Sequence, residues 1–134
     1  MALTFIDSGI LIAAARGNED VSAAAQKILD DATRTFASSV FIKMETIPYA
    51  VFFQREEERQ FYEAFFDNVS AWAEVDLSLA EAALVEASRI NLGAMDSLHV
   101  AAAQKTGSVE LYTTERTTKP MHQTNLVSVK TVQH

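Results

Sequence analysis

Short apolar segments alternate with segments of helical periodicity along this chain of 134 residues, and the alternation narrows the folds open to it. Strands are predicted near residues 3–6, 34–37, 73–77, 109–113 and 127–131. Helices are predicted over residues 9–15, 19–31, 40–51, 55–73, 79–91 and 96–106. Strands that alternate with helices typically form a parallel sheet covered on both faces. We therefore predict one domain over residues 1–134, with an α/β fold of three layers (α/β/α) and a mainly parallel five-stranded sheet.

Four of the predicted helices begin next to residues suited to capping. Ser8 precedes the first helix, Asn18 the second, Ser38 and Ser39 the third, and Ser78 the fifth, where Glu81 completes a capping box. Side chains of these types accept hydrogen bonds from the free backbone N–H groups of a first helical turn. We predict N-caps at Ser8, Asn18, Ser38-Ser39 and Ser78.

Aromatic residues are concentrated in the segment from Phe52 to Trp72. Five of the eight phenylalanines lie between Phe52 and Phe66. In the predicted helix 55–73, the apolar residues share one stripe at helical spacing: Phe61, Tyr62, Phe65, Phe66, Val69 and Trp72. One helix face in a small domain does not readily cover so many rings, and aromatic residues are favoured at interface cores. We therefore predict a homodimer that uses part of the Phe52–Trp72 segment.

Four acidic residues stand beside apolar segments, where a carboxylate has no evident structural purpose. Asp7 follows the first predicted strand, and Glu115 follows the fourth. Glu45 interrupts an apolar run, and Asp96 lies in the first turn of its helix. Open parallel sheets bind ligands at the carboxyl ends of their strands, so Asp7 and Glu115 are expected to line one crevice. Asp96 adds a carboxylate at a positively polarised helix start.

Carboxylates that converge repel one another unless a cation or a proton intervenes. Oxygen-rich sites suit Mg²⁺ or Mn²⁺. Each acid taken alone also has a structural explanation: Asp7 and Asp96 are typical capping residues, and Glu45 can be a solvated helix residue. The acids in this order and context favour a shared site. We identify Asp7, Glu45, Asp96 and Glu115 as candidate catalytic residues and metal ligands.

The net charge of −7 usually counts against a protein that binds nucleic acid. The four candidate acids contribute four of those charges, and a bound divalent ion would offset part of them. Cysteine is absent, which excludes a disulfide framework and a cysteine zinc site. No apolar run is long enough to span a bilayer, and the N-terminus lacks the basic segment of a signal peptide. We expect a cytoplasmic protein that does not associate with membranes.

The segments around the acids carry motifs: FIDSGILI at residues 5–12, SVFIKME at 39–45, GAMDSLHVAAA at 93–103 and LYTTE at 111–115. Together these motifs resemble the PIN-domain family, which includes the VapC-type ribonuclease toxins. The resemblance spans nearly the whole chain and, with the alternation of strands and helices, implies the strand order 3-2-1-4-5. The chain departs from the family pattern at Glu115, where the family usually has Asp followed by an apolar residue.

The resemblance implies an endoribonuclease that depends on Mg²⁺ or Mn²⁺ and cleaves single-stranded RNA. It also implies the toxin of a toxin–antitoxin pair, with an antitoxin protein as partner. On this interpretation Ser8 and Thr113 orient Asp7 or the water of the metal by hydrogen bonds. Arg116 and Lys119 form a small basic loop that can contact the phosphate backbone.

Two alternatives stay open at the level of sequence. The domain can instead be a catalytically weak or inactive PIN-like module that binds or scaffolds other molecules, which suits the negative charge and Glu115. His99 lies one turn after Asp96 and can face the same crevice. We interpret His99 as a packed, hydrogen-bonded histidine.

Overall fold

The computed structural model describes residues 1–17 and 19–133, and its strands form one five-stranded sheet in the order β3-β2-β1-β4-β5. Every neighbouring pair of strands is parallel. The strands are β1 Ala2–Ile6, β2 Arg34–Ser38, β3 Ala71–Trp72, β4 Glu110–Thr113 and β5 Ser128–Thr131. The predicted α/β class and the predicted strand order are both confirmed.

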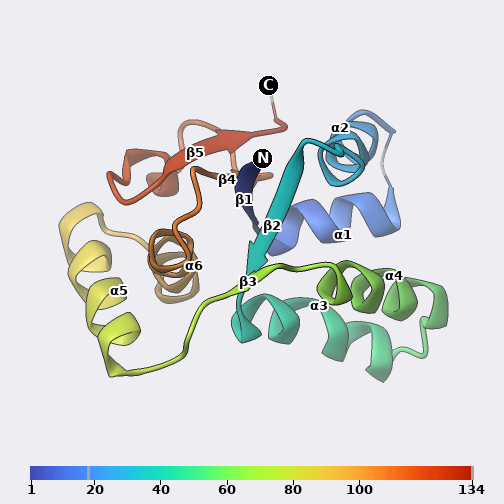
Figure 1. Cartoon of the computed structure of the whole chain (residues 1–134), viewed down its shortest axis with the longest axis horizontal. Coiled ribbons are helices and arrows are strands. Elements are labelled where there is room, and N and C mark those ends of the chain that lie inside the picture. The colour runs from blue at the N-terminus through green and yellow to red at the C-terminus, as the bar shows by residue number, and fades with distance from the viewer. Residues whose placement is uncertain (18, 134) are drawn as a thin grey trace.

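Helices connect the strands and cover both faces of the sheet. In the described residues they are α1 Ser8–Arg16, α2 Glu19–Leu29, α3 Val40–Phe52, α4 Glu56–Asp67, α5 Leu77–Ile90, α6 Ala94–Lys105 and the 3₁₀ helix η1 Pro120–Gln123. Figure 1 shows α5 and α6 on one side of the sheet and α1 and α2 on the other. None of the described helices has the length and hydropathy needed to cross a bilayer.

The central strand β1 carries the apolar core of the sheet. Phe5 and Ile6 are fully buried, and Phe5 pairs with the buried Leu111 of β4. Buried strands of this kind are continuous apolar runs, because helices cover both faces of the sheet. All the strands point the same way, so the carboxyl ends of β1 and β4 lie side by side at one edge.

Two helices are capped by aspartates rather than by the predicted serines. Asp7 is the N-cap of α1, and its side chain accepts a hydrogen bond from the backbone N–H of Ser8. Asp76 is the N-cap of α5 and accepts from the N–H of Leu79. Ser8 and Ser78 therefore lie inside their helices, because an acidic residue one or two positions earlier already satisfies the first turn. The predicted cap Asn18 lies outside the described residues.

The aromatic segment contains a shorter helix than predicted. Helix α4 ends at Asp67, and Trp72 belongs to β3, where it pairs with Ser38 of β2. The predicted helix 55–73 and the predicted strand 73–77 are therefore wrong at this boundary. Pairing with the edge of the sheet outweighs helical spacing, because the backbone of β3 completes hydrogen bonds that β2 leaves open. Phe65 and Phe66 are buried in the core.

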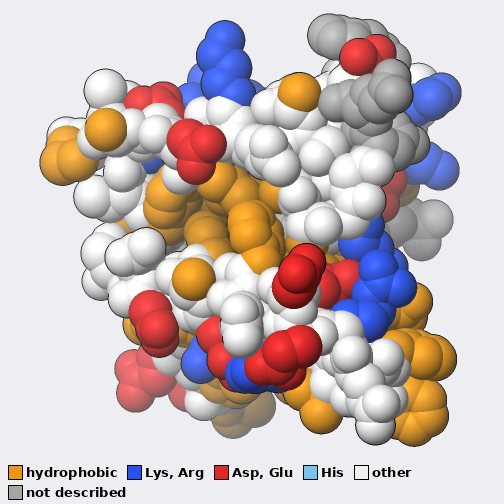
Figure 2. All heavy atoms as spheres, turned by 90° about the vertical axis from the view of Figure 1, so that its right-hand side faces the viewer, with side chains coloured by type: hydrophobic (Ala, Val, Ile, Leu, Met, Phe, Trp, Pro, Cys, Tyr) orange, Lys and Arg blue, Asp and Glu red, His pale blue; other side chains and the backbone are white. Residues whose placement is uncertain are grey.

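The turn after α3 leaves a group of aromatic residues exposed. Phe52 and Phe53 have 78% and 56% of their surface accessible, and Tyr49 packs against Phe53. Figure 2 views the molecule from the side of α1, α2 and α4, and it shows hydrophobic side chains at the bottom of a hollow with charged groups nearby. Tyr49, Phe52 and Phe53 therefore form an exposed aromatic surface at the end of α3.

Candidate active site

The candidate site lies at the carboxyl edge of the sheet, where β1 gives way to α1. Asp7 follows β1 directly, and Thr113 ends β4 beside it. The first turn of α1 passes so close to the loop after β4 that a Cβ atom on Gly9 would lie 2.2 Å from Thr114 Oγ1. Only glycine permits this approach, and it brings the residues after both strands together.

Asp7 is buried and held on both of its carboxylate oxygens. Its Oδ1 accepts from the N–H of Ser8 at 2.9 Å, and its Oδ2 accepts from the Thr113 hydroxyl at 2.7 Å. Burial raises the pKa of Asp7 and outweighs the lowering effect of His99 and of these hydrogen bonds. The carboxylate is therefore fixed in orientation, while its negative charge is poorly compensated.

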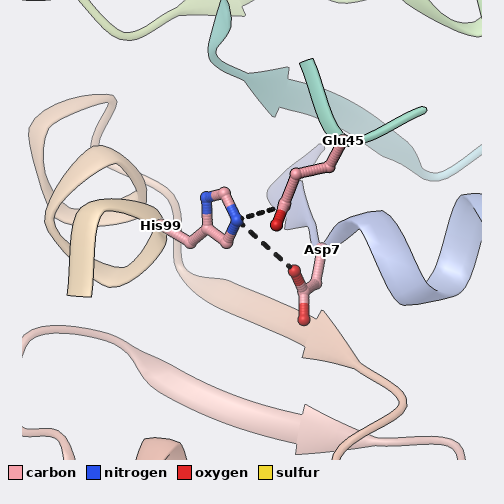
Figure 3. A group of neighbouring side chains, drawn as sticks. All are labelled: Asp7, Glu45 and His99. Carbon is pink, nitrogen blue, oxygen red and sulfur yellow. Dashed lines mark hydrogen bonds and ion pairs between the residues drawn. The ribbon is translucent and has the colours of Figure 1, made fainter. Parts of the chain in front are cut away.

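His99 joins Asp7 and Glu45. Figure 3 shows the Nε2 side of the imidazole ring facing both carboxylates, with His99 on α6 and Glu45 on α3. His99 Nε2 lies 2.5 Å from Glu45 Oε1 and 3.9 Å from Asp7 Oδ1. The nearest ligand atoms of the three residues all lie within 4.8 Å of one another. The sequence interpretation of His99 as packed and hydrogen-bonded is confirmed, but its partner was not foreseen.

The contact between His99 and Glu45 changes the pKa of both groups. The hydrogen bond from His99 lowers the pKa of Glu45, against the effect of partial burial. Burial by itself lowers the pKa of His99, but the carboxylates of Glu45, Asp7 and Asp96 together raise it. Three carboxylates therefore act on the imidazole of His99, and His99 in turn favours the ionised form of Glu45.

Asp96 and Glu115 stand outside the tight group of Asp7, Glu45 and His99. The pKa of Asp96 is raised to about 6, first by burial and then by the charge of Asp7, with smaller effects from Glu115 and Glu45. Asp7, Glu45 and Glu115 therefore all act electrostatically on Asp96. The backbone N–H of Glu115 donates to the Thr113 hydroxyl at 3.0 Å, and its carbonyl accepts from His122 Nε2 at 2.8 Å.

The remaining predicted residues take different places. Ser8 begins α1, and its hydrogen bonding also lowers the pKa of Glu45. Thr113 is buried and bridges Asp7 to Glu115, as described above. Arg116 and Lys119 are exposed in a turn closed by a backbone hydrogen bond of 2.9 Å between them. The structure therefore surrounds Asp7 with Ser8 and Thr113, and it leaves the two basic residues facing solvent.

The donor set fits a hard divalent cation. Among the ion pairs of the described residues, no lysine or arginine reaches Asp7, Glu45, Asp96 or Glu115. Each oxygen of Asp7 accepts one hydrogen bond and keeps a free lone pair. Carboxylate oxygens of this kind are the ligands of Mg²⁺ and Mn²⁺. The buried, unpaired acid and the raised pKa of Asp96 indicate a place for positive charge.

The comparisons with known proteins agree on the fold. No protein-family model and no curated protein matches the sequence. One similar structure is VapBC2 from Rickettsia felis bound to a DNA fragment from the promoter, with a TM-score of 0.69 and 12% identity over 96% of this chain and 98% of that chain. DNA-bound VapBC from Salmonella typhimurium gives a TM-score of 0.68 and 14% identity, over 98% of this chain and 99% of that chain.

A third similar structure is a toxin–antitoxin complex from Klebsiella pneumoniae, with a TM-score of 0.68 and 20% identity over 98% of both chains. Identities this low make the likeness one of fold. The all-parallel sheet, its strand order and these neighbours define the chain as an α/β protein with a PIN-like fold, the fold that the sequence motifs predicted.

Proposed function

We propose that this chain is an endoribonuclease that depends on Mg²⁺ or Mn²⁺ and cleaves single-stranded RNA, with Asp7, Glu45, Asp96 and Glu115 at its centre. The observation that carries the proposal is that Asp7, Glu45 and Glu115 all act on Asp96 at the carboxyl edge of the sheet, where none of the four acids has a lysine or arginine partner in the described residues. Strongly perturbed carboxylates in a crevice are typical of functional sites.

Each residue has a definite task in this proposal. Asp7 is the rigid ligand, since Ser8 and Thr113 hold both of its oxygens. Glu45 and Asp96 complete the set of oxygen donors, and Glu115 acts from the outer position. When bound, a divalent ion supplies positive charge at the scissile phosphate and makes water a better nucleophile at neutral pH. The side chains orient the phosphate by holding that charge in a fixed place.

The exposed loop after Glu115 suits a phosphate backbone. Arg116 and Lys119 are both exposed, and they follow Glu115 within four residues of sequence. Contacts from basic side chains to phosphate position a nucleic acid without selecting its sequence. A single strand can bend an unstacked segment into a crevice that a duplex does not enter. These features support single-stranded RNA as the substrate.

We also propose that the chain works as the toxin of a toxin–antitoxin pair, with an antitoxin protein as its partner. The fold neighbours are VapBC complexes and a toxin–antitoxin complex, which supports a partner of this kind.

The exposed Phe52 and Phe53 support self-association through the start of the Phe52–Trp72 segment. Light scattering over a wide concentration range tests the homodimer, and Phe52→Ser should shift it towards monomer.

The substitution Asp96→Asn tests the catalytic proposal. It keeps the shape of the side chain, but it removes a charge that the metal needs. We expect loss of cleavage of a defined single-stranded RNA in the presence of Mn²⁺, with an unchanged circular dichroism spectrum. Asp76→Asn is the matched control, because it makes the same change at the N-cap of α5 and should leave cleavage intact.

Two results would contradict this mechanism. Wild-type cleavage by the Asp96→Asn variant would remove Asp96 from the reaction. If the wild-type protein, freed from any antitoxin, cleaves no RNA with either metal, the inactive binding or scaffold module becomes the better description. Glu115→Gln should reduce cleavage less than Asp96→Asn, because Glu115 lies at the outer position.

A further inference from the structure

His99 stands at the centre of the candidate site, although the proposed function assigns it no task. The ring is 1% exposed, and it packs near Phe5 at a centroid distance of 6.5 Å. Its Nε2 atom faces Glu45 and Asp7, as Figure 3 shows. A buried imidazole between two carboxylates has two possible uses. It is a third metal ligand through the Nε2 lone pair, or it donates the Nε2 proton to a carboxylate.

The distance between His99 Nε2 and Glu45 Oε1 favours proton donation. The two atoms lie 2.5 Å apart, a distance that suits a short charge-assisted hydrogen bond. Two ligands of one octahedral ion, each at roughly 2.1 Å from the metal, lie about 3 Å apart. The observed contact is too close for neighbouring ligands of a Mg²⁺ ion, and it joins a donor to an acceptor.

The other ring nitrogen leads to the same assignment. His99 Nδ1 is buried and has no hydrogen-bond partner among the described residues. If Nε2 gave its lone pair to a metal, the ring proton would sit on Nδ1, where no acceptor meets it. Histidines that ligate metals almost always donate their second N–H to an acceptor. With the proton on Nε2, the neutral ring leaves only a lone pair on Nδ1, which costs less than an unpaired N–H.

We propose that His99 is a positioning residue rather than a metal ligand, and that its Nε2–H holds the Glu45 carboxylate in place beside Asp7. This inference rests on the proposed function, because it assigns His99 a role at the same metal site. One oxygen of Glu45 is engaged by His99, so the other is left for the cation. The donor set then contains oxygen alone, which favours Mg²⁺ and Mn²⁺ over metals that prefer imidazole.

The first test locates the ring proton directly. Long-range ¹H–¹⁵N spectra of the ¹⁵N-labelled protein distinguish the two ring nitrogens of His99, and the spectrum of His99→Gln identifies its signals. We expect the proton on Nε2 both without metal and with saturating Mg²⁺. A proton that moves from Nε2 to Nδ1 when Mg²⁺ is added would make His99 a ligand and would overturn the inference.

The second test measures binding of Mg²⁺ and Mn²⁺ by calorimetry. His99→Leu fills the same apolar space but cannot donate a hydrogen bond, and we expect its affinity to fall about 10- to 100-fold. His99→Gln keeps an N–H donor and should retain most of the affinity. Melting curves confirm that both variants fold, and the spectra of the wild-type protein decide the question if His99→Leu does not.

The two proposals fail in different ways. If the wild-type protein binds Mg²⁺ and His99→Leu binds it equally well, His99 does not position Glu45, and the proposed metal site stands. If the wild-type protein binds neither ion, the metal site itself fails, and the role of His99 fails with it. Equal losses in His99→Gln and His99→Leu would contradict positioning by a hydrogen bond.

Discussion

The buried acids at the amino edge and at the carboxyl edge of the sheet have opposite kinds of partners. Asp7, after β1, and Glu110, at the start of β4, are each 6% exposed on neighbouring strands. Glu110 pairs with Arg34, accepts from the Thr4 hydroxyl at 2.7 Å and lies 3.2 Å from Lys130 Nζ. Asp7 has a hydroxyl and a backbone N–H as partners, no lysine or arginine pairs with it among the described residues, and the imidazole Nε2 of His99 lies 3.9 Å from its Oδ1.

This difference distinguishes an acid that stabilises the fold from one that we propose binds a metal. A buried charge with a cation and hydrogen bonds around it holds its surroundings together, and losing one partner is costly. A buried charge without a cation is a cost to the fold, and it persists where a ligand can offset it. Among the described residues, the buried acid at the amino edge of the sheet is therefore paired with cations, whereas the buried acid at the carboxyl edge has no lysine or arginine partner.

Glu110→Gln should have the largest effect on the metal-free protein. It removes one of the two carboxylate partners of Arg34, whose side chain is 17% exposed, and leaves only the ion pair with Asp31. We expect a loss of about 3 kcal/mol in the free energy of unfolding, measured by urea denaturation. Glu63→Gln, at the surface pair with Arg59, is the control and should change the stability by less than about 0.5 kcal/mol. Equal losses in both variants would break the contrast between the two edges.

Addition of Mn²⁺ should stabilise the folded protein through the acids of the carboxyl edge and not through Glu110. At a free concentration of 100 times the dissociation constant, binding raises the free energy of unfolding by about 2.7 kcal/mol. Thermal melts with and without the ion measure the effect. It should vanish in Asp7→Asn and persist in Glu110→Gln. A melting temperature that does not respond to millimolar Mn²⁺ or Mg²⁺ in the wild-type protein would place no cation at this edge.

Asp96→Asn should stabilise the protein in the absence of metal. The pKa of Asp96 is raised from 3.8 to about 6, so the folded protein holds a proton there over a range in which the unfolded chain has lost it. The stability due to Asp96 is full below the unfolded pKa and is lost as the pH rises through the folded pKa. At pH 7, with allowance for solvent screening, the variant should gain about 1 kcal/mol.

Urea titrations in a chelator between pH 4 and pH 7 test this sign. The wild-type stability should carry a component that falls with rising pH, and Asp96→Asn should lack it. If the stability of the variant follows the wild-type curve, the charge of Asp96 does not destabilise the fold. The acids at the carboxyl edge would then cost less stability than their lack of ion pairs indicates.

Lys130→Ala should have the smallest effect. Its side chain is 53% exposed, so its ion pair with Glu110 is screened by water. We expect a loss of about 0.5 kcal/mol in urea denaturation. A small loss would show that Arg34, rather than Lys130, is the partner that stabilises the buried Glu110. A loss as large as that of Glu110→Gln would assign it to Lys130 instead.

The sequence predicted the sheet more accurately than it predicted local boundaries. Apolar segments such as Leu3–Ile6 are stable in the interior of a sheet that helices cover on both faces, so the alternation predicted a parallel sheet. The alternation together with the resemblance of the motifs to a known family then predicted the strand order. Capping at Ser8 and Ser78 was misplaced by one or two residues. The helix through Trp72 was misplaced because the free edge of β2 recruits that segment as a strand, and helical spacing carries no information about an edge.

The sequence by itself determined the fold class and the short list of acids beside apolar segments, because these follow from local periodicity and from where carboxylates interrupt it. The strand order needed, in addition, the resemblance of the motifs to a known family. Only the tertiary structure decided how the buried acids are partnered. It showed that Glu110 pairs with Arg34, that Asp7 has no lysine or arginine partner among the described residues, and that His99 Nε2 meets Glu45 across 54 positions of sequence. Periodicity predicts which face of an element is apolar, but the compensation of a buried charge depends on distances between side chains that only the packed fold brings together.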